Sequence, residues 1–278
     1  MPIPLADKPI IITGAATGIG RATAVACAAE GMPVVLTGRR EDRLRAAAAT
    51  LPAGARSLIV PGDVNSPDDC QRAVDACLAE FGSVYAVDAN AGYGLEAPMH
   101  EMSDADLRAI FETNFFGTMN IIRPALPHML EARRGHILVC SSCLSEFTIP
   151  NYGAYSATKA AQQHIARAMK LELAPAGVHV SSIHPVGTRT EFFDVVADRS
   201  GGAPIVKHQP DLFMQSPEKV ARATVRCLKR PKPEVWTSPI VRYGMAIGGM
   251  FPRLSDFFVK NMVDERTRLR ADHAASKP

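Results

Sequence analysis

Short apolar runs alternate along this chain with longer segments of helical periodicity. The runs are rich in β-branched residues and close on glycine, aspartate, asparagine, serine or proline, as buried strands do. They occupy residues 9–14, 33–38, 56–64, 84–92, 135–142 and 178–185. The helical segments between them are 18–30, 41–50, 67–81, 103–132 and 152–174. Strands that are apolar on both faces and separated by helices predict a parallel sheet covered on both sides, which is a doubly wound α/β fold.

Local signals set the expected ends of several helices. Ser66 or Asp68 is expected to cap the third helix, and Ser103 is expected to cap the fourth. Pro124 and Pro127 fall inside the fourth helix, so we expect a kink or an irregular turn there.

The length of 278 residues suits one large domain that buries a full core. The 31 basic and 28 acidic residues give a net charge of +3, which carries no electrostatic signal for nucleic acid. The chain contains no run of about 18 apolar residues, and its start lacks the pattern of a secretory signal. We therefore expect a cytoplasmic protein with one domain over 1–238 and a C-terminal helical extension over 239–278.

The tetrapeptide CSSC at 140–143 resembles a redox or metal motif, and the chain holds 6 cysteines in all. Zinc sites need a second ligand pair with tight spacing, which the sequence lacks, so we expect no metal. In a reducing compartment the thiols are expected to be unpaired and packed as small apolar groups. A thiol redox or metal protein that uses CSSC is kept as a rival hypothesis.

A glycine-rich turn, TGAATGIG at 13–20, joins the first expected strand to the first helix. Gly14, Gly18 and Gly20 allow a tight turn and let main-chain N–H groups approach an anion, beside the positive end of the helix dipole. A glycine turn alone is a weak signal, but its place between strand and helix favours a dinucleotide site. The glycine spacing resembles that of the classical short-chain dehydrogenases/reductases (the SDR family), with three residues between the first two glycines.

This resemblance covers about residues 8–235 and implies a Rossmann-type sheet that binds a nicotinamide cofactor. In the family, the residue that closes the second strand reads the adenosine ribose, and an acidic residue there selects NAD(H). Here that position is Gly38, followed by Arg39 and Arg40. Guanidinium groups suit a 2′-phosphate, so NADP(H) is favoured over NAD(H), with Arg39 as the preferred contact. The plainer alternative is that these arginines belong to a solvated loop.

The resemblance implies further cofactor contacts along the chain. Ala89 replaces the first Asn of the family's Asn-Asn-Ala-Gly turn, and Val186 stands where the family usually has glycine. Asp63 matches the adenine-contacting aspartate of the family. Besides the glycines of the turn at 13–20 and the arginines Arg39 and Arg40, the resemblance implies the following cofactor-binding residues: Thr17, Ile19, Asp63, Val64, Asn90, Gly92, Tyr155, Lys159, Pro185, Val186, Thr188 and Thr190.

The pentapeptide YSATK places Tyr155 and Lys159 four residues apart, on one face of a helix. Exchange between a carbonyl and an alcohol needs a proton donor or acceptor beside the oxygen while hydride moves at carbon. A lysine cation and the positive nicotinamide of the oxidised cofactor would stabilise a phenolate and lower the pKa of the phenol. Tyr155 is therefore the expected general acid/base. A surface tyrosine with a solvated lysine is the plainer explanation of the pair taken alone.

The resemblance assigns the other catalytic roles. It implies that Lys159 also bonds the nicotinamide ribose, and that Asn114 positions a water that links Lys159 to solvent. The carbonyl-orienting serine of the family lies thirteen residues before the tyrosine, which is Ser142 here. Its neighbour Ser141 is expected to point away or to bond the backbone. Asn114, the serine pair after the fifth expected strand and the segment HPVGTRT after the sixth should all lie at the carboxyl edge of the parallel sheet, where such folds bind ligands.

The apolar segment 188–215, around SGG, predicts a lid over the substrate. Its composition suggests a hydrophobic ketone, aldehyde or alcohol, although these side chains would also suit plain packing onto the domain. For the C-terminal segment we rank an oligomer contact first, part of the substrate pocket second and peripheral membrane contact third. Family members are commonly dimers or tetramers, which implies a homodimer or homotetramer.

The main hypothesis is an NADP(H)-dependent oxidoreductase that interconverts a carbonyl and an alcohol. The rival from another class is a catalytically silent NADP(H)-binding sensor of the same fold. Such a protein would usually lack the tyrosine or the lysine, whereas this chain has both Tyr155 and Lys159.

Overall fold

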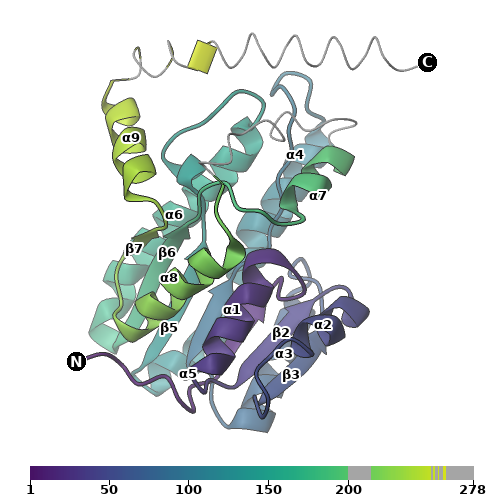
Figure 1. Ribbon diagram of the computed structural model, residues 1–278, viewed down its shortest axis with the longest axis vertical. Helices are drawn as coiled ribbons and strands as arrows, with labels where there is room; N and C mark the ends of the chain where they lie inside the picture. Colours follow the sequence, from purple (N-terminus) through teal and green to yellow (C-terminus); the bar gives the residue numbers. More distant parts are fainter. Residues whose placement is uncertain (200–213, 252, 254–255, 257–258, 261–278) are drawn as a thin grey trace.

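The computed structural model describes residues 1–199 and 214–251, together with 253, 256, 259 and 260. Within these residues, 7 parallel strands form one sheet in the order β3-β2-β1-β4-β5-β6-β7 (Figure 1). The strands are β1 (Ile10–Thr13), β2 (Val34–Gly38), β3 (Ser57–Pro61), β4 (Ala86–Ala89), β5 (Gly135–Cys140), β6 (Val178–His184) and β7 (Glu234–Trp236). The strand order reverses between β1 and β4, which is where doubly wound sheets bind ligands. The expected fold class is confirmed.

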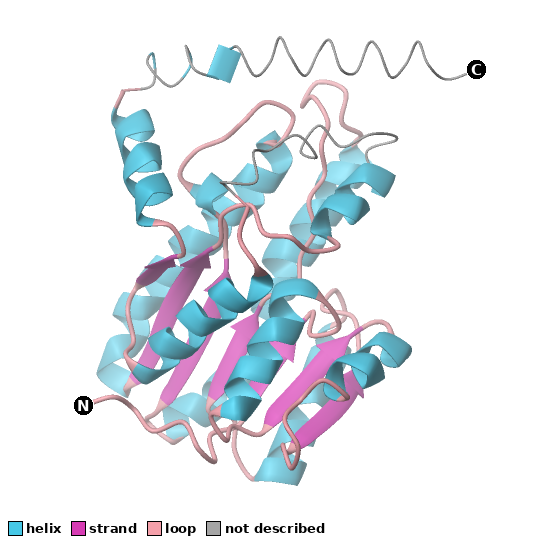
Figure 2. Cartoon of the chain, in the orientation of Figure 1, coloured by secondary structure: helices cyan, strands magenta, loops and turns pink. Residues whose placement is uncertain are grey.

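Helices cover both faces of the sheet (Figure 2). On one face lie α1 (Gly18–Ala29), α2 (Glu41–Ala48) and α8 (Pro217–Lys229). On the other lie α3 (Pro67–Phe81), α5 (Gly117–Glu131) and α6 (Gly153–Leu173). Successive strand residues divide between the two faces: Ile10 and Ile12 pack on the α1 side, and Ile11 packs on the α3 side. All three are fully buried, which explains why the strand sequence is apolar throughout.

The fourth helical segment differs from the single helix expected over 103–132. It consists of α4 (Asp104–Phe111), a π-helical turn at Glu112–Phe116 and then α5. The irregular turn lies before the two prolines, and α5 runs through Pro124 and Pro127 as one helix. Ser66 and Ser103 do cap their helices, each accepting a hydrogen bond from the main-chain N–H three residues later, at 3.2 and 3.1 Å.

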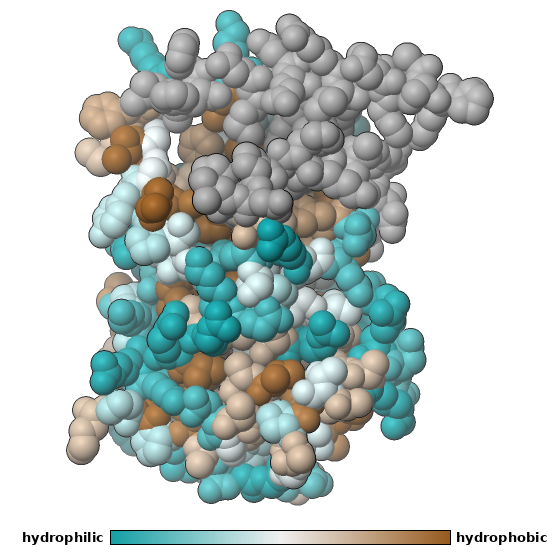
Figure 3. All heavy atoms as spheres, viewed as in Figure 1, coloured by the Kyte–Doolittle hydropathy of each residue, from teal (hydrophilic) through white to brown (hydrophobic). Residues whose placement is uncertain are grey.

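The described residues also form the 3-10 turns η2 (Cys143–Ser145) and η3 (Ala174–Ala176), the helix α7 (Phe192–Arg199) and the helix α9 (Pro239–Met250). Part of the expected lid, residues 200–213, lies outside the described residues. Helix α9 stands away from the sheet in Figure 1, and hydrophobic side chains are exposed over it in Figure 3. The largest of these are Ile240, Tyr243, Ile247, Met250 and Phe251. The boundary at 238 and the role of the extension stay predictions.

The sequence led us to expect neither a membrane-spanning helix nor a metal site. Among the described residues, no helix combines the length and apolar character needed to cross a membrane. The described part also contains no group of His, Cys, Asp and Glu side chains arranged to hold a metal ion.

Candidate active site

The glycine turn is held by side chains from the next strand across the switch point. Asn90 Nδ2 donates to Thr13 O at 2.9 Å, and the Thr13 hydroxyl accepts from Asn90 N at 3.0 Å. A Cβ atom on Gly20 would lie only 2.7 Å from Asn90 Nδ2. Gly14 and Gly18 have φ angles of 64° and 54°, which favour glycine. The carboxyl ends of β1 and β4 are thus tied together beneath the start of α1.

The N-terminus of α1 suits an anion. Among the described residues, no side chain caps the first turn of α1, because the N-cap residue Thr17 makes no capping hydrogen bond. Gly18, Ile19 and Gly20, which begin the helix, carry no carboxylate. By contrast, the first turn of α3 is capped by Ser66 and contains acidic residues. The uncapped N–H groups and the helix dipole therefore fit the pyrophosphate of a dinucleotide.

The end of β2 presents arginines to solvent. Arg39 is exposed, and Arg40 precedes α2. Glu191, which lies between β6 and α7, pairs with Arg40 at 3.5 Å and with Arg43 at 3.7 Å. Sequence reasoning missed both Glu191 and Arg43, because their proximity depends on how the segment after β6 crosses the sheet edge.

Asp63 and Val64 form the turn that follows β3. Asp63 N donates to the Asp69 carboxylate at 2.8 Å, and the Asp63 carboxylate accepts from Asn65 N at 3.0 Å. The hydrogen bond from Asp63 N, together with Arg72, lowers the pKa of Asp69. Val64 packs against Gly117, where a Cβ atom would lie 2.7 Å from its methyl group. This turn lies at the carboxyl end of β3, and its contact with adenine stays a prediction.

Tyr155 and Lys159 both lie on α6 and are buried. Lys159 Nζ lies 5.6 Å from the centroid of the Tyr155 ring. Burial raises the pKa of Tyr155 above its ordinary value, and the nearby Ser142 side chain offsets only part of that rise. Burial also lowers the pKa of Lys159. The structure thus brings the predicted acid/base, lysine and serine into one apolar setting.

The two serines of CSSC have different partners, as expected. The Ser141 hydroxyl donates to Lys159 O at 2.8 Å, so it bonds the backbone of α6. Ser142 precedes η2, and its hydroxyl oxygen accepts from Leu144 N at 3.1 Å. That bond leaves the Ser142 proton available to a substrate oxygen. The expected backbone bond of Ser141 is therefore observed, whereas the substrate-orienting role of Ser142 stays a prediction.

The cysteines of the same motif are buried free thiols, as are the other four in the described residues. Burial raises the pKa of Cys140 and of Cys143 to about 11. Both side chains therefore stay protonated at neutral pH and are poor nucleophiles.

Asn114 lies in the π-helical turn and is fully buried. Its side chain accepts from Tyr93 N at 2.9 Å and donates to Thr158 Oγ1 at 3.0 Å. Its main-chain oxygen accepts from Thr118 Oγ1 at 2.8 Å and from Gln162 Nε2 at 2.7 Å. Sequence reasoning missed Thr158 and Gln162, although both lie on the helical face that carries Tyr155 and Lys159.

Gly92 allows this cluster to close. A Cβ atom there would lie 2.9 Å from Asn114 Oδ1 and 3.5 Å from Lys159 Nζ. A side chain at Gly92 would therefore displace the Asn114 amide, whereas the distance to Lys159 Nζ is an ordinary van der Waals contact.

The segment after β6 crosses the glycine turn. Val186 N donates to Thr237 Oγ1 at 3.3 Å, and Val186 O accepts from Thr188 Oγ1 at 2.6 Å. These bonds fix the backbone that follows Pro185 despite the missing family glycine. Further on, the Thr190 methyl group lies 3.0 Å from the place of a Cβ atom on Gly18.

Apolar side chains surround the Tyr155 phenol. The Phe192 ring lies 5.5 Å from the Tyr155 ring, and Tyr152 packs edge-on at 6.1 Å. The same cluster of buried and half-buried residues includes Leu95, Ile110, Leu144, Ile149 and Val196. An uncharged, hydrophobic group would therefore find a suitable setting here.

Comparisons with known proteins match most of the chain. The family described as short chain dehydrogenase matches residues 8–200, which contain all four predicted catalytic residues. Oxidoreductase asL5 of Sarocladium schorii is 35% identical over 216 residues, covering 78% of this chain and 86% of that protein.

Two solved structures are also similar. A short chain dehydrogenase/reductase from Burkholderia phymatum in complex with NAD is 27% identical, with a TM-score of 0.81, covering 91% of this chain and 96% of that one. An alcohol dehydrogenase from the archaeon Thermococcus sibiricus, complexed with 5-hydroxy-NADP, is 29% identical, with a TM-score of 0.71. That match covers 82% of this chain and 95% of the archaeal one.

Proposed function

The chain belongs to the short-chain dehydrogenase family and is an oxidoreductase, and from this premise we propose that it interconverts a ketone or aldehyde and an alcohol with NADP(H). The observation that carries the proposal is the buried cluster of Tyr155, Lys159 and Ser142, in which the Lys159 ammonium lies 5.6 Å from the centroid of the Tyr155 ring. When bound, the nicotinamide supplies the hydride exchange at carbon. The side chains supply the proton and hold the oxygen.

Tyr155 acts as the general acid in reduction. Because burial raises its pKa, the phenol carries its proton at neutral pH, which is the form that reduction needs. Lys159 places a cation beside the ring and favours the phenolate left after proton transfer. Ser142 donates a hydrogen bond to the same substrate oxygen as charge develops on it.

Asn114 has a positioning role in this proposal. Its side chain joins Tyr93, after β4, to Thr158 on α6, and so holds the helix that carries the acid/base. A water linking Lys159 to solvent stays a prediction. Two donors already occupy the Asn114 main-chain oxygen, so a water bound there requires one of them to move.

NADP(H) is the preferred cofactor in the proposal, with NAD(H) as the alternative. Support comes from Arg39 and Arg40 after β2 and from the absence of a carboxylate at Gly38 in the sequence. Guanidinium groups bind phosphate in a bidentate manner, whereas a carboxylate at this place would repel it. Similar structures include one with NAD and one with 5-hydroxy-NADP, so they do not distinguish between the two cofactors. The preference for NADP(H) therefore rests on the residues that follow β2.

The proposed substrate is a small hydrophobic carbonyl compound or alcohol. Support comes from the aromatic and aliphatic side chains around Tyr155, especially Phe192. We also propose a cytoplasmic homodimer or homotetramer. Support comes from the several exposed apolar side chains of α9, among them Ile240, Tyr243 and Ile247.

A substrate screen tests the proposal directly. Purified protein is mixed with NADPH or NADH and with ketones, aldehydes and alcohols of graded hydrophobicity, and nicotinamide absorbance is followed. We expect turnover with NADPH and an uncharged ketone or aldehyde, and its loss in Tyr155→Phe. NADPH binding without turnover across the screen would favour the silent sensor, and equal turnover by Tyr155→Phe would reject the mechanism.

A further inference from the structure

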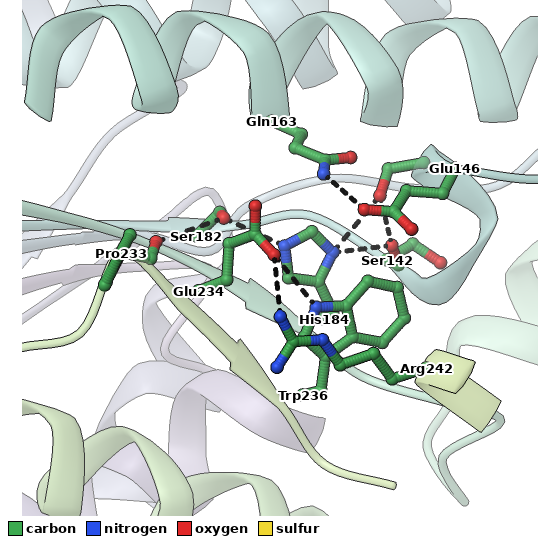
Figure 4. A network of polar contacts seen from close by, with 10 residues as sticks. Ser142, Glu146, Gln163, Ser182, His184, Pro233, Glu234, Trp236 and Arg242 are labelled. Carbon is green, nitrogen blue, oxygen red and sulfur yellow. Dashed lines mark hydrogen bonds and ion pairs between the residues drawn. The ribbon is translucent and has the colours of Figure 1, made fainter. Parts of the chain in front are cut away.

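A buried polar network lies directly behind Ser142 (Figure 4). At its centre is His184, the last residue of β6, which is fully buried. One ring nitrogen, Nδ1, lies 3.0 Å from Ser142 O and 3.1 Å from Ser145 Oγ. The other, Nε2, lies 2.8 Å from Ser182 Oγ.

The partners of His184 determine its tautomer. Ser142 O is a carbonyl and only accepts, so Nδ1 must carry the proton. A neutral ring then leaves Nε2 as an acceptor for the Ser182 hydroxyl. Burial lowers the pKa of His184, which keeps the ring neutral. Charged groups near the ring are Glu146, Glu234 and Arg242. The imidazole is therefore a fixed N–H donor aimed at the Ser142 peptide.

An aromatic side chain also stacks on one face of the His184 ring. Trp236 of β7 stacks on it, with ring centroids 4.4 Å apart and an interplanar angle of 5°. Trp236 Nε1 donates to Glu234 at 3.2 Å, and Glu234 pairs with Arg242 of α9 at 3.9 Å. Stacking and two in-plane hydrogen bonds leave the imidazole little freedom to turn.

The same network restrains the turn that carries Ser142. The Ser145 hydroxyl donates to Ser142 O at 2.7 Å, so this oxygen accepts from both the serine and the histidine. Cys143 N donates to Pro185 O at 3.0 Å, which adds a second tie between η2 and the end of β6. The orientation of the Ser142 peptide is thus set from the β6 side.

We propose that His184 is a positioning residue for Ser142, which holds the substrate oxygen in the proposed reaction. By fixing the Ser142 carbonyl, it fixes the direction of the Ser142 hydroxyl toward Tyr155 and the substrate. This inference rests on the proposed function, because it matters for turnover only if Ser142 acts on a carbonyl. A shift of about 1 Å in a catalytic group costs on the order of 100-fold in rate.

The chain offers a matched control in His136. This histidine is also fully buried, and its Nε2 lies 2.8 Å from Ser181 Oγ of β6. It lies near the start of β5, at the opposite end of the strand from Ser142. Substitutions of His136 therefore perturb a similar buried histidine–serine pair without touching the proposed site.

The experiment compares His184→Asn, His184→Gln and His184→Leu with the same three changes at His136. An Asn amide can replace the Nδ1–H donor, whereas a Gln amide reaches the place of Nε2. With NADPH and cyclohexanone, acetophenone or decanal, His184→Gln and His184→Leu should lower kcat at least about 10-fold. His184→Asn should recover most of kcat, and the NADPH dissociation constant should change less than about twofold throughout. The His136 variants should lower Tm without changing kcat.

A second measurement needs no substrate. Nitrogen-15 NMR of labelled histidine in the wild-type protein should show the Nδ1–H tautomer for the signal that disappears in His184→Asn. An Nε2–H tautomer would overturn the inference, as would kcat values for the His184 variants that match those of the His136 variants. Unchanged kcat in Ser142→Ala, or no turnover of the three probes by the wild-type protein, would instead contradict the proposed function. In either case the NMR spectrum would still test whether His184 carries its proton on Nδ1.

Discussion

Lys159 Nζ donates a hydrogen bond to the main-chain oxygen of Cys140 at 2.8 Å. A buried ammonium group is costly unless it is hydrogen-bonded, and this carbonyl offsets part of that cost. The contact ties α6, which carries Tyr155, to the end of β5, which leads into Ser142. The proposed acid/base and the proposed oxygen-binding serine are therefore positioned as one unit.

Replacement of the phenol should remove chemistry and spare cofactor binding. Tyr155→Phe loses the transferable proton, so we expect kcat to fall by about 100- to 10,000-fold. The NADPH dissociation constant, measured by fluorescence, should stay near the wild-type value. Tyr152→Phe, which alters the ring packed edge-on against Tyr155, is the matched control and should keep most activity. Similar kcat values for the two variants would contradict the assignment.

Reversal of charge after β2 should change the choice of nucleotide. Arg39→Asp removes a phosphate partner and adds repulsion, so kcat/KM for NADPH should fall by at least about 10-fold relative to NADH. Arg45→Asp, on the exposed side of α2 where Arg45 pairs with Glu41, makes the same charge change as a control. An unchanged NADPH/NADH ratio in Arg39→Asp would show that the 2′-phosphate is read elsewhere.

The two directions of the reaction should respond oppositely to pH. Burial raises the Tyr155 pKa, so the phenol stays protonated through neutral pH and reduction should hold its rate until the solution becomes alkaline. Oxidation needs the phenolate, so the oxidation rate should rise as the pH increases from neutral to alkaline. Initial rates in both directions from pH 6 to pH 10 check this sign. An oxidation rate that falls as pH rises would rule out Tyr155 as the base.

Regular patterns made much of the fold predictable from the sequence. Ile10, Ile11 and Ile12 show why, because a strand buried on both faces has to be continuously apolar. The spacing of Tyr155 and Lys159 similarly predicted one helical face, on which both lie.

Other features depend on contacts between distant segments. The π-helical turn at Asn114 is associated with hydrogen bonds from Thr118 and Gln162, and no local pattern in 103–132 indicates it. The pairing of Glu191 with Arg40 spans the sheet edge. The stacking of His184 on Trp236 joins the neighbouring strands β6 and β7, which α7 and α8 separate along the chain. These relationships require the tertiary arrangement before they can be recognised.

Acid should destabilise the protein partly through His136. Burial lowers the pKa of His136 from 6.5 to about 3. Above pH 6.5 the histidine is neutral in both the folded and the unfolded chain, and its full contribution to stability is present. As pH falls from 6.5 toward 3, the unfolded chain binds a proton that the folded chain does not, so the free energy of unfolding falls by up to about 1.4 kcal/mol per pH unit.

Urea unfolding from pH 4 to pH 8 measures this contribution. His136→Leu should lower stability at pH 8 but flatten its dependence on pH. His164→Leu, at an exposed position on α6, should leave the wild-type slope unchanged. Parallel curves for wild type and His136→Leu would show that another group causes the acid sensitivity.

The cysteines of CSSC should be dispensable for turnover. Because burial raises the pKa of Cys140 and Cys143 to about 11, only a very small fraction of either thiol is ionised at pH 7.5. Iodoacetamide should therefore label neither thiol quickly in the native protein, and both after denaturation, as mass spectrometry would show. The double variant Cys140→Ser with Cys143→Ser should keep kcat within about threefold, since neither sulfur takes part in proton transfer. Rapid native labelling together with loss of activity in the double variant would instead support the thiol-based rival, in which the serines only separate the reactive groups.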